Sequence, residues 1–443
     1  MTKKIIVIFH RDLRTTDHNG IRAAREAYPD CRLLPIFIFT PEQVDSVKNP
    51  YKSANSVRFM IESLQDLEEQ TSNTLTLYYG QTLDILQSLI VKLLPDLVGI
   101  VETADYTPYA LKRQQEIRGL CALNSITYYL TEDCYLTPPG TVTNAQGRMF
   151  QKFTPFWESA RRRQVARPLP APRRTVWERG PELGGGARGE IISLTDARRR
   201  FIGPASRLGN SVRHGGRQEG LKLLQNLPEK YDTTRDLLAH ETSRLSAHNH
   251  YGTISIREVY WTAKDAANKH LDEFIRQLYW RDFYGHICYA FDTLYGVNPY
   301  NFWTEADTDP KRREKASGPA YTDPKIRQAF EAWTRGETGE DLVDAGMKQL
   351  LAEGFIHNRA RLVVADYLVK GLGVPWRWGE RWFAQHLVDY DFAQNFGNWC
   401  WVASVLPFSQ APFRRHIPER IQARLDPELE YTIQWLGEDE DEE

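Results

Sequence analysis

The segments IIVIF at 5–9 and LLPIFIF at 33–39 decide the fold class of the first part of the chain. Each is a short apolar run, which is typical of a strand buried on both faces of a sheet. Three more strand-like runs follow, with amphipathic helix-like stretches between them; the runs lie at 74–79, 97–102 and 125–130, and the stretches near 18–28, 54–70, 82–94 and 108–122. This alternation predicts a doubly wound parallel sheet, so we expect an α/β domain over 1–130.

The middle and the end of the chain have different patterns. Residues 131–215 are rich in Pro, Gly and Arg, as in PPG at 138–140 and RPLPAP at 167–172, which predicts a long interdomain linker. From 216 onward the apolar pattern is helical, with clear examples at 254–268, 271–290, 324–335, 341–352, 358–371 and 377–388. We therefore expect an all-α domain over 216–443.

Composition limits the class of protein. The formal net charge is −2, but the last six residues are all acidic, and without them 52 acidic residues face 56 basic ones. No apolar run approaches the roughly 20 residues of a membrane span, and the N-terminus lacks the layout of a signal peptide. Five scattered cysteines form no CxxC pair, so neither a metal site nor a disulfide framework is expected. We expect a monomer in the cytoplasm or nucleus, neither secreted nor membrane-bound.

Two segments carry residues suited to binding an anion or a heterocycle. TSRLSA at 242–247 offers hydroxyl groups at the start of a helix, which suits a phosphate, although Thr242 or Ser243 could simply cap that helix. LVDYDFAQNFGNWCW at 387–401 places two carboxylates and an amide among aromatic residues. Its Asp residues could pair with Arg361 in a structural ion pair, and its Trp residues could simply fill a core.

A third segment, QLYWRDFY at 277–284, has helical spacing. Gln277, Trp280, Arg281 and Tyr284 stand at i, i+3, i+4 and i+7 and so share one helix face. An amide, an indole and a guanidinium together could hold a planar ring and a phosphate. The alternative is an ordinary polar helix flank. No GxGxxG follows the first strand, so a nicotinamide cofactor is not indicated.

Taken together, these motifs resemble the photolyase/cryptochrome family, and most closely its class I cyclobutane pyrimidine dimer photolyases. The similar segments, in order, are FHRDLRTTD at 9–17, KFTPF at 152–156, TSRLSA at 242–247, WRDFY at 280–284, GETGEDLVDAGMKQL at 336–350, GFIHNRARLVVADYLVK at 354–370, WRWGERWF at 376–383 and DYDFAQNFGNWCW at 389–401. The resemblance implies an α/β antenna-type domain, a linker, and a helical domain that binds FAD.

The resemblance also implies which residues hold FAD. Those expected at the pyrophosphate end are Tyr231, Thr242, Ser243, Leu245, Ser246 and Arg281. Those expected around the isoalloxazine are Asn358, Arg361, Asp389, Asp391 and Asn395. Asn395 matches the position that faces flavin N5, where plant cryptochromes typically carry Asp and animal cryptochromes Cys.

For the substrate, the resemblance implies UV-damaged DNA whose pyrimidine dimer is flipped out of the duplex. Trp280 and Trp401 match the aromatic walls of the lesion pocket. The positions matching phosphate contacts are Arg235, Arg359 and Arg414. Asn358 stands where a (6-4) photolyase has its proton-donating second His.

Two residues depart from the cyclobutane pattern. Gln277 replaces the usual Glu, and from its chemistry it could donate to a thymine carbonyl without adding a negative charge. Leu362 replaces a Met that usually touches the dimer.

Electron supply and light harvesting are also implied by the family. Trp399 and Trp376 match the inner and middle members of an aromatic electron-transfer chain. Tyr321 is nearest in spacing to the outer member, whereas we expect Trp303 and Trp333 to be core aromatics. A second antenna chromophore is possible and its identity is open. Folate is not favoured, because Ala110 replaces the Glu of folate-binding relatives.

We therefore expect a deoxyribodipyrimidine photolyase, a carbon–carbon lyase in which photoexcited reduced FAD transfers an electron to a cyclobutane dimer. The alternatives are a cryptochrome blue-light receptor and a (6-4) photolyase. Asn395 and the short C-terminal tail favour repair over signalling, and Gln277 is the residue that favours the (6-4) reaction.

Overall fold

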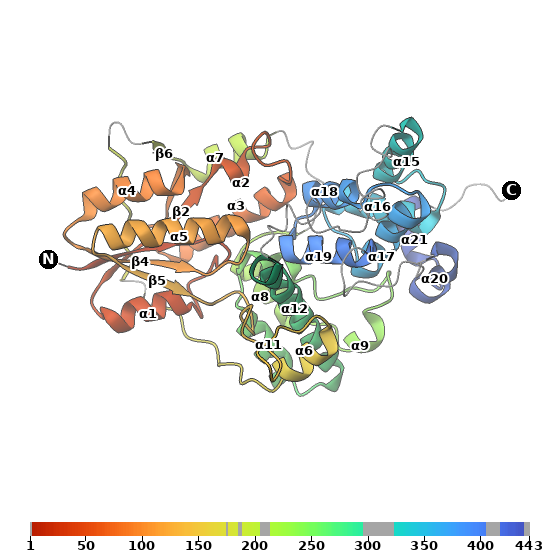
Figure 1. Cartoon of the computed structure of the whole chain (residues 1–443), viewed down its shortest axis with the longest axis horizontal. Coiled ribbons are helices and arrows are strands. Elements are labelled where there is room, and N and C mark those ends of the chain that lie inside the picture. The colour runs from red at the N-terminus through yellow and green to blue at the C-terminus, as the bar shows by residue number, and fades with distance from the viewer. Residues whose placement is uncertain are drawn as a thin grey trace.

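A computed structural model describes residues 2–173, 176–184, 188–203, 213–295, 323–404 and 417–437, apart from the side chains of 290–295 and 419. An α/β domain and a helical domain lie side by side, and the two chain termini are at opposite ends of the molecule (Figure 1). The predicted fold class is therefore confirmed. The exact boundaries 1–130, 131–215 and 216–443 remain a prediction.

The sheet has the order β5-β4-β1-β2-β3-β6, and its first five strands are parallel. The strands are β1 (Lys4–Ile8), β2 (Arg32–Phe39), β3 (Thr76–Gly80), β4 (Leu97–Thr103), β5 (Thr127–Thr131) and β6 (Gly189–Ile191). The strand order reverses between β1 and β4, which is the switch point where such sheets offer a crevice. All five predicted strands are present, and β6, from the expected linker, adds an antiparallel edge.

Helices cover both faces of the sheet because successive strand side chains point to opposite sides. Ile5 and Val7 pack in one core and Ile6 and Ile8 in the other. The helices of this domain are α1 (Asn19–Ala27), α2 (Pro41–Val44), α3 (Ala54–Gln70), α4 (Thr82–Leu93), α5 (Pro108–Leu123) and α7 (Leu194–Phe201). The central strands β1 and β2 are buried on both faces, so each is a largely continuous apolar run, which made them recognisable in the sequence.

The helical domain surrounds one large apolar core. Its helices are α8 (Arg217–Gln225), α9 (Tyr231–Thr234), α10 (Ser246–Tyr251), α11 (Ile256–Asp265), η3 (Lys269–Leu271), α12 (Asp272–Tyr295), α15 (Pro324–Arg335), α16 (Asp341–Glu353), α17 (Asn358–Asp366), η5 (Tyr367–Gly371), α18 (Trp376–His386), α19 (Phe392–Val402), α20 (Pro418–Leu425) and α21 (Glu430–Leu436). Helix α6 (Phe153–Ala160) packs on α12. None of the helices in the described ranges is long and apolar enough to cross a membrane.

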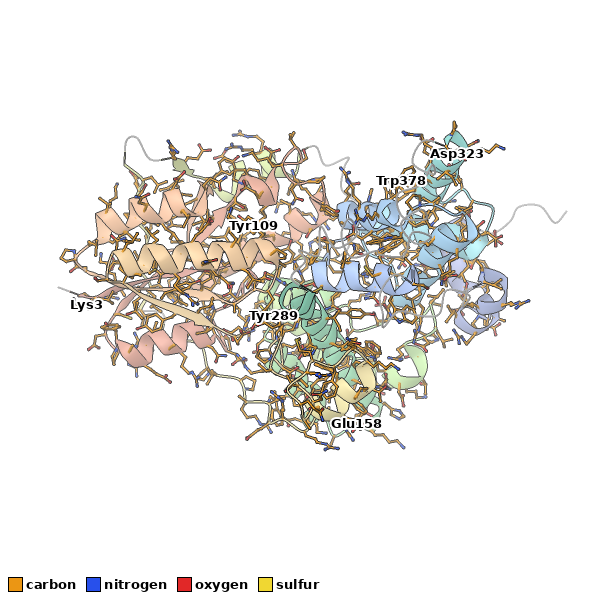
Figure 2. All side chains as sticks on the ribbon, viewed as in Figure 1. Lys3, Tyr109, Glu158, Tyr289, Asp323 and Trp378 are labelled. Atoms are coloured by element: carbon orange, nitrogen blue, oxygen red, sulfur yellow. The ribbon has the colours of Figure 1, made fainter. Side chains whose placement is uncertain are left out.

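Long helix α12 reaches the α/β domain at its C-terminal end. Tyr289, labelled near the centre of Figure 2, meets the edge of Tyr106 with 5.5 Å between ring centroids. Gly140 lies against the Tyr289 ring, because a Cβ at residue 140 would come within 2.5 Å of that ring. This contact fixes where the linker crosses from one domain to the other.

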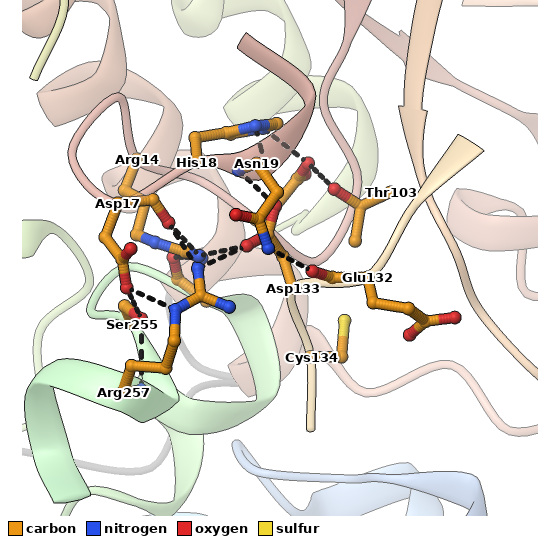
Figure 3. Close-up of polar contacts among 12 residues, drawn as sticks. Arg14, Asp17, His18, Asn19, Thr103, Glu132, Asp133, Cys134, Ser255 and Arg257 are labelled. Carbon is orange, nitrogen blue, oxygen red and sulfur yellow. Dashed lines mark hydrogen bonds and ion pairs between the residues drawn. The ribbon is translucent and has the colours of Figure 1, made fainter. Parts of the chain in front are cut away.

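A buried charge network joins the two domains (Figure 3). Arg257 of α11 donates to Asp17 at 2.9 Å and to Asp133 at 2.6 Å. Asp17 also accepts from Ser255 Oγ and from the backbone N–H of Leu169. Burial alone would raise the pKa of Asp17, but Arg257 and Ser255 outweigh it and hold that pKa below its ordinary value. The network therefore favours docked domains at neutral pH.

The substitution Asp17→Asn should destabilise the protein by on the order of 3 kcal/mol, because it breaks a buried ion pair. Asn readily adopts the left-handed backbone of residue 17, where φ is 51°, so the loss reports the carboxylate rather than backbone strain. Urea unfolding measures it. As the control, Glu116→Gln removes an exposed pair with Lys112 and should cost less than about 1 kcal/mol. Equal losses of unfolding free energy in both variants would contradict the claim that Asp17 forms a stabilising buried ion pair.

Candidate functional site

The first part of the site brings three distant segments together at Asp389. Arg361 of α17 donates to both carboxylate oxygens of Asp389, at 2.9 and 3.1 Å. The hydroxyl of Ser246, at the start of α10, also hydrogen-bonds to Asp389. Burial opposes ionisation of Asp389, but Arg361 and Ser246 keep its pKa below the ordinary value. The ion pair considered from the sequence is therefore present.

Asp391 meets the α/β domain. Its carboxylate pairs with Arg11, which follows β1, and lies 3.2 Å from His250 Nδ1. Its other oxygen accepts from the Gln394 N–H and so caps α19. Burial works against the charge, but Arg11 and His250 hold the pKa of Asp391 far below its usual range. One carboxylate thus both begins α19 and holds that helix to the other domain.

Asn395, one turn into α19, is 7% exposed. Its Nδ2 donates to the backbone oxygen of Glu380 at 3.1 Å and to Oε1 of Glu380 at 3.0 Å. Because a backbone carbonyl only accepts, this contact fixes which end of the amide is nitrogen. Oδ1 therefore faces away from Glu380, and no described residue donates to it.

Glu380 is a site residue that the sequence analysis did not single out, although it lies in the WRWGERWF segment. It is almost fully buried, and burial raises its pKa to about 7 despite the hydrogen bond from Asn395. A carboxyl group among so many aromatic residues was the available signal. Its pairing with a residue 15 positions away could not be inferred without the fold.

The side chains predicted to share one face of α12 make contacts in two different places. Trp280 stacks on Phe153 with 3.6 Å between ring centroids, and Gln277 bonds to Glu273. Arg281 turns toward the domain junction, where it donates to the backbone oxygens of Cys134 and Asn249. These residues do not converge on one ligand.

Helices α12 and α19 are joined by direct side-chain contacts. Tyr284 Oη donates to Asn398 Oδ1 at 3.0 Å, and Gln394 Nε2 donates to the Arg281 backbone oxygen at 2.8 Å. Gly397 allows this close approach, because a Cβ there would lie 2.5 Å from the Tyr284 ring. The partly exposed Trp280 and Trp401 are thus carried by two helices held in register.

The expected electron-transfer residues Trp399 and Trp376 are both buried. Trp399 meets the edge of Phe383 at 5.1 Å and of Trp333 at 6.4 Å, while Trp376 meets Phe396 at 5.8 Å. Trp333 is fully buried and donates to the Val364 backbone oxygen, as expected of a core aromatic. Tyr321, Trp303 and Arg414 lie outside the described residues.

The two described arginines expected to contact DNA are already paired with carboxylates. Arg235 lies 2.9 Å from Glu273 and 3.5 Å from Asp236. Arg359 lies 2.7 Å from the same Asp236. A phosphate that approached these guanidinium groups would therefore have to compete with Asp236 and Glu273.

The remaining predicted cofactor residues differ in exposure. Tyr231 and Leu245 are buried in the helical core, whereas Asn358 is exposed at the first position of α17. Thr242 and Ser243 are half-buried, and their hydroxyls make no hydrogen bond to any described residue. Their unused hydroxyl donors suit a pyrophosphate, and Asn395 Oδ1 suits a ring N–H. The residues present therefore fit a flavin dinucleotide.

Family models match both halves of the chain. A model described as DNA photolyase matches residues 5–173, and one described as the FAD binding domain of DNA photolyase matches 274–441. The deoxyribodipyrimidine photo-lyase of Halobacterium salinarum is 30% identical, over 97% of this chain and 88% of its own length.

The chain belongs to the photolyase/cryptochrome family. A crystal structure of an archaeal photolyase from Sulfolobus tokodaii, solved with two FAD molecules, has a TM-score of 0.75 and 32% identity, over 98% of this chain and 90% of its own. Cryptochrome-2 of Arabidopsis thaliana is 26% identical, over 99% of this chain and 71% of its own length. The family resemblance and the FAD-binding domain are thus confirmed.

The substitution Glu380→Gln should change how stability depends on pH. The folded protein keeps the Glu380 proton up to about pH 7, whereas an unfolded Glu releases it near its ordinary pKa of 4.5. Folding therefore binds a proton between these values, and Glu380 lowers the free energy of unfolding as pH rises through that window. Gln does not titrate. The free energy of unfolding of the variant, relative to wild type, should rise by on the order of 3 kcal/mol from pH 4.5 to 8.

Urea unfolding across this pH range measures the difference. The exposed control Glu26→Gln should run parallel to wild type. A Glu380→Gln curve that is also parallel to wild type would show that Glu380 is already ionised in the folded protein.

Proposed function

We propose that this protein is a deoxyribodipyrimidine photolyase that uses blue light to split cyclobutane pyrimidine dimers in DNA. The observation that carries the proposal is the fixed amide of Asn395, buried on α19 with its oxygen directed away from Glu380. By resemblance this residue faces flavin N5. An uncharged acceptor suits a fully reduced, anionic flavin better than the Asp typical of plant cryptochromes at this position. When bound, reduced FAD supplies the photoexcited electron that splits the dimer and afterwards receives it back.

The chain's own residues would hold and orient the FAD and the flipped dimer and would shield them from water. Thr242 and Ser243 would offer donors to the pyrophosphate, and Asp389, which Arg361 keeps ionised, would lie beside the ring. Trp280 and Trp401 would flank the flipped dimer, and Arg235 and Arg359 would bind backbone phosphates. Asn358 and Asp391 complete the proposed isoalloxazine surroundings, and Tyr231, Leu245, Ser246 and Arg281 complete those of the pyrophosphate end.

The neighbourhood of α17 counts against the (6-4) reaction. His357 caps α17 by accepting the Arg359 N–H, and burial lowers its pKa to about 4, so it is neutral at physiological pH. Asn358 follows it and is not an acid. Gln277 remains the residue that favours (6-4) repair. Because Cryptochrome-2 of Arabidopsis thaliana is among the relatives, a cryptochrome is the second candidate function.

For a second chromophore, Ala110 is buried at the start of α5 and has no carboxylate to offer folate. The Sulfolobus tokodaii photolyase holds two FAD molecules, which imply a novel light-harvesting cofactor in that protein. We therefore infer that, if the protein binds a second chromophore, a flavin is a better candidate for it than folate.

The proposal predicts light-dependent repair. Reduced protein should restore absorbance near 260 nm to an oligonucleotide that carries one cyclobutane thymine dimer, under blue light but not in the dark. A (6-4) oligonucleotide run in parallel should show no recovery. Recovery on neither substrate by a protein that binds FAD would instead favour a cryptochrome.

A second prediction separates electron supply from repair. Trp399→Phe should strongly slow the light-driven reduction of bound FAD, because it removes the oxidisable indole one turn from Asn395 on α19. Repair by chemically reduced protein should continue. Trp333→Phe, the control in the same aromatic cluster, should leave photoreduction near the wild-type rate. Slow photoreduction in the Trp333 variant alone would assign the inner electron donor to Trp333.

A further inference from the structure

Arg213 begins a segment, 213–217, that is fastened to helix α3 of the α/β domain. The backbone oxygen of Arg213 accepts from Arg58 Nη2 at 3.5 Å. Three successive N–H groups, those of residues 215–217, donate to side chains of α3 at 2.8, 3.0 and 3.1 Å. Gly215 permits this close approach, because a Cβ at residue 215 would collide with a backbone oxygen of α3. The α/β domain therefore holds the backbone of Arg213 in place.

The side chain of Arg213 crosses from this segment to the helical domain. It is 7% exposed, and its guanidinium carbon lies 3.5 Å from the centroid of the Phe355 ring. Arg361, which holds Asp389, lies over the same ring at 5.4 Å. Arg213 also contributes to the low pKa of Asp389. The Phe355 ring thus holds the Arg213 guanidinium beside the ion pair at the centre of the proposed flavin site.

The loop that carries Thr242 and Ser243 lies within electrostatic range of Arg213. Burial and then the neighbouring Arg244 lower the pKa of Arg213 to about 10, and Glu241 is among the carboxylates that oppose the shift. Arg213 therefore stays charged at neutral pH. Because residues 241 and 244 both act on its charge, the guanidinium lies close to the two hydroxyl residues between them.

The nearest carboxylate to Arg213 is not in an ideal position for it. Glu353 Oε2 lies 3.7 Å from Arg213 Nη2 and accepts a hydrogen bond from Gln349 at 3.1 Å. A guanidinium and a phosphate approach more closely, at about 2.7–2.9 Å, and often form two parallel hydrogen bonds. A phosphate at this place would therefore interact with Arg213 more strongly than Glu353 does.

We propose that Arg213 is a further FAD-binding residue, which the α/β domain delivers across the domain junction to the pyrophosphate at Thr242 and Ser243. This inference rests on the placement of the pyrophosphate in the proposed function. Two hydroxyl donors and one buried guanidinium would bind the same anion in a site that excludes water. The role of Arg213 could not be recognised in the sequence, because it lies in the expected linker and far along the chain from Phe355.

The experiment measures the dissociation constants of FAD, ADP and riboflavin in the dark, with the full-length protein stripped of flavin. ADP shares the pyrophosphate with FAD, and riboflavin shares the flavin ring. Arg213→Met keeps a long apolar side chain over Phe355 but removes the charge. It should weaken FAD and ADP by the same factor, at least about tenfold, and change riboflavin by less than about twofold.

Glu353→Gln separates phosphate binding from a purely structural ion pair. If Arg213 served only to pair with Glu353, this variant and Arg213→Met would break the same pair and weaken all three ligands alike. Phosphate binding predicts that Glu353→Gln binds FAD at least as tightly as wild type, because it removes a competing acceptor.

Arg217→Met is the matched control. Arg217 belongs to the same segment, but its guanidinium is held by both carboxylate oxygens of Glu258, at 2.6 and 2.9 Å. The ratio of FAD to riboflavin affinity should stay at the wild-type value in this variant. Arg213→Lys tests the same claim with the charge retained. It should weaken FAD and ADP severalfold, because Lys lacks the planar fork and stacks poorly on Phe355.

Equal weakening of FAD and riboflavin in Arg213→Met would overturn the inference, and so would wild-type affinity for FAD and ADP in either Arg213 variant. Failure of the proposed function would look different. Selective loss of FAD and ADP in Arg213→Met, in a protein that repairs no dimer under blue light, would remove photolyase activity and keep the Arg213 contact.

Discussion

The Arg11 guanidinium is the group on which the arrangement of the two domains depends. It follows the central strand β1, pairs with Asp391 of the helical domain, lies 3.6 Å from Asp105 of its own domain, and donates to the His250 backbone oxygen at 3.2 Å. A largely buried cation of this kind is tolerated only when it is paired and hydrogen-bonded. Because two of these partners come from the helical domain, charge satisfaction and domain docking are the same event.

The position of this contact follows from the sheet. Strand order reverses between β1 and β4, and doubly wound sheets open a ligand crevice at that point. Arg11 follows β1 and Asp105 follows β4, so both residues lie beside this crevice. Asp391 of the helical domain contacts Arg11 at the same place. The same carboxylate caps α19, so the helix that carries Asn395, Trp399 and Trp401 starts at the domain junction. Glu380 and Tyr284 then fix the orientation of that helix from α18 and α12.

Much of this could be predicted from the sequence, because it depends on local pattern. The central strands β1 and β2 are largely continuous apolar runs, and the Arg361–Asp389 pair joins opposite charges that stand in two largely apolar segments. β6 could not be predicted, because three residues in a Gly-rich stretch carry no periodicity. Glu380 and Glu273 were missed for another reason: a carboxylate acquires its role from the residue it contacts. For Gln277 the residue type is plain from the sequence, but the direction of its hydrogen bond depends on Glu273.

The central claim is that the α/β domain helps to build the flavin site through Arg11, and the FAD dissociation constant of Arg11→Lys tests it most directly. Lys keeps the charge but cannot reach Asp391, Asp105 and the His250 carbonyl together, so we predict folded protein that binds FAD at least about tenfold more weakly. Arg22→Lys on the exposed face of α1 should bind FAD like wild type. Wild-type FAD affinity in Arg11→Lys would show that the helical domain forms the site without this ion pair, and would contradict the account.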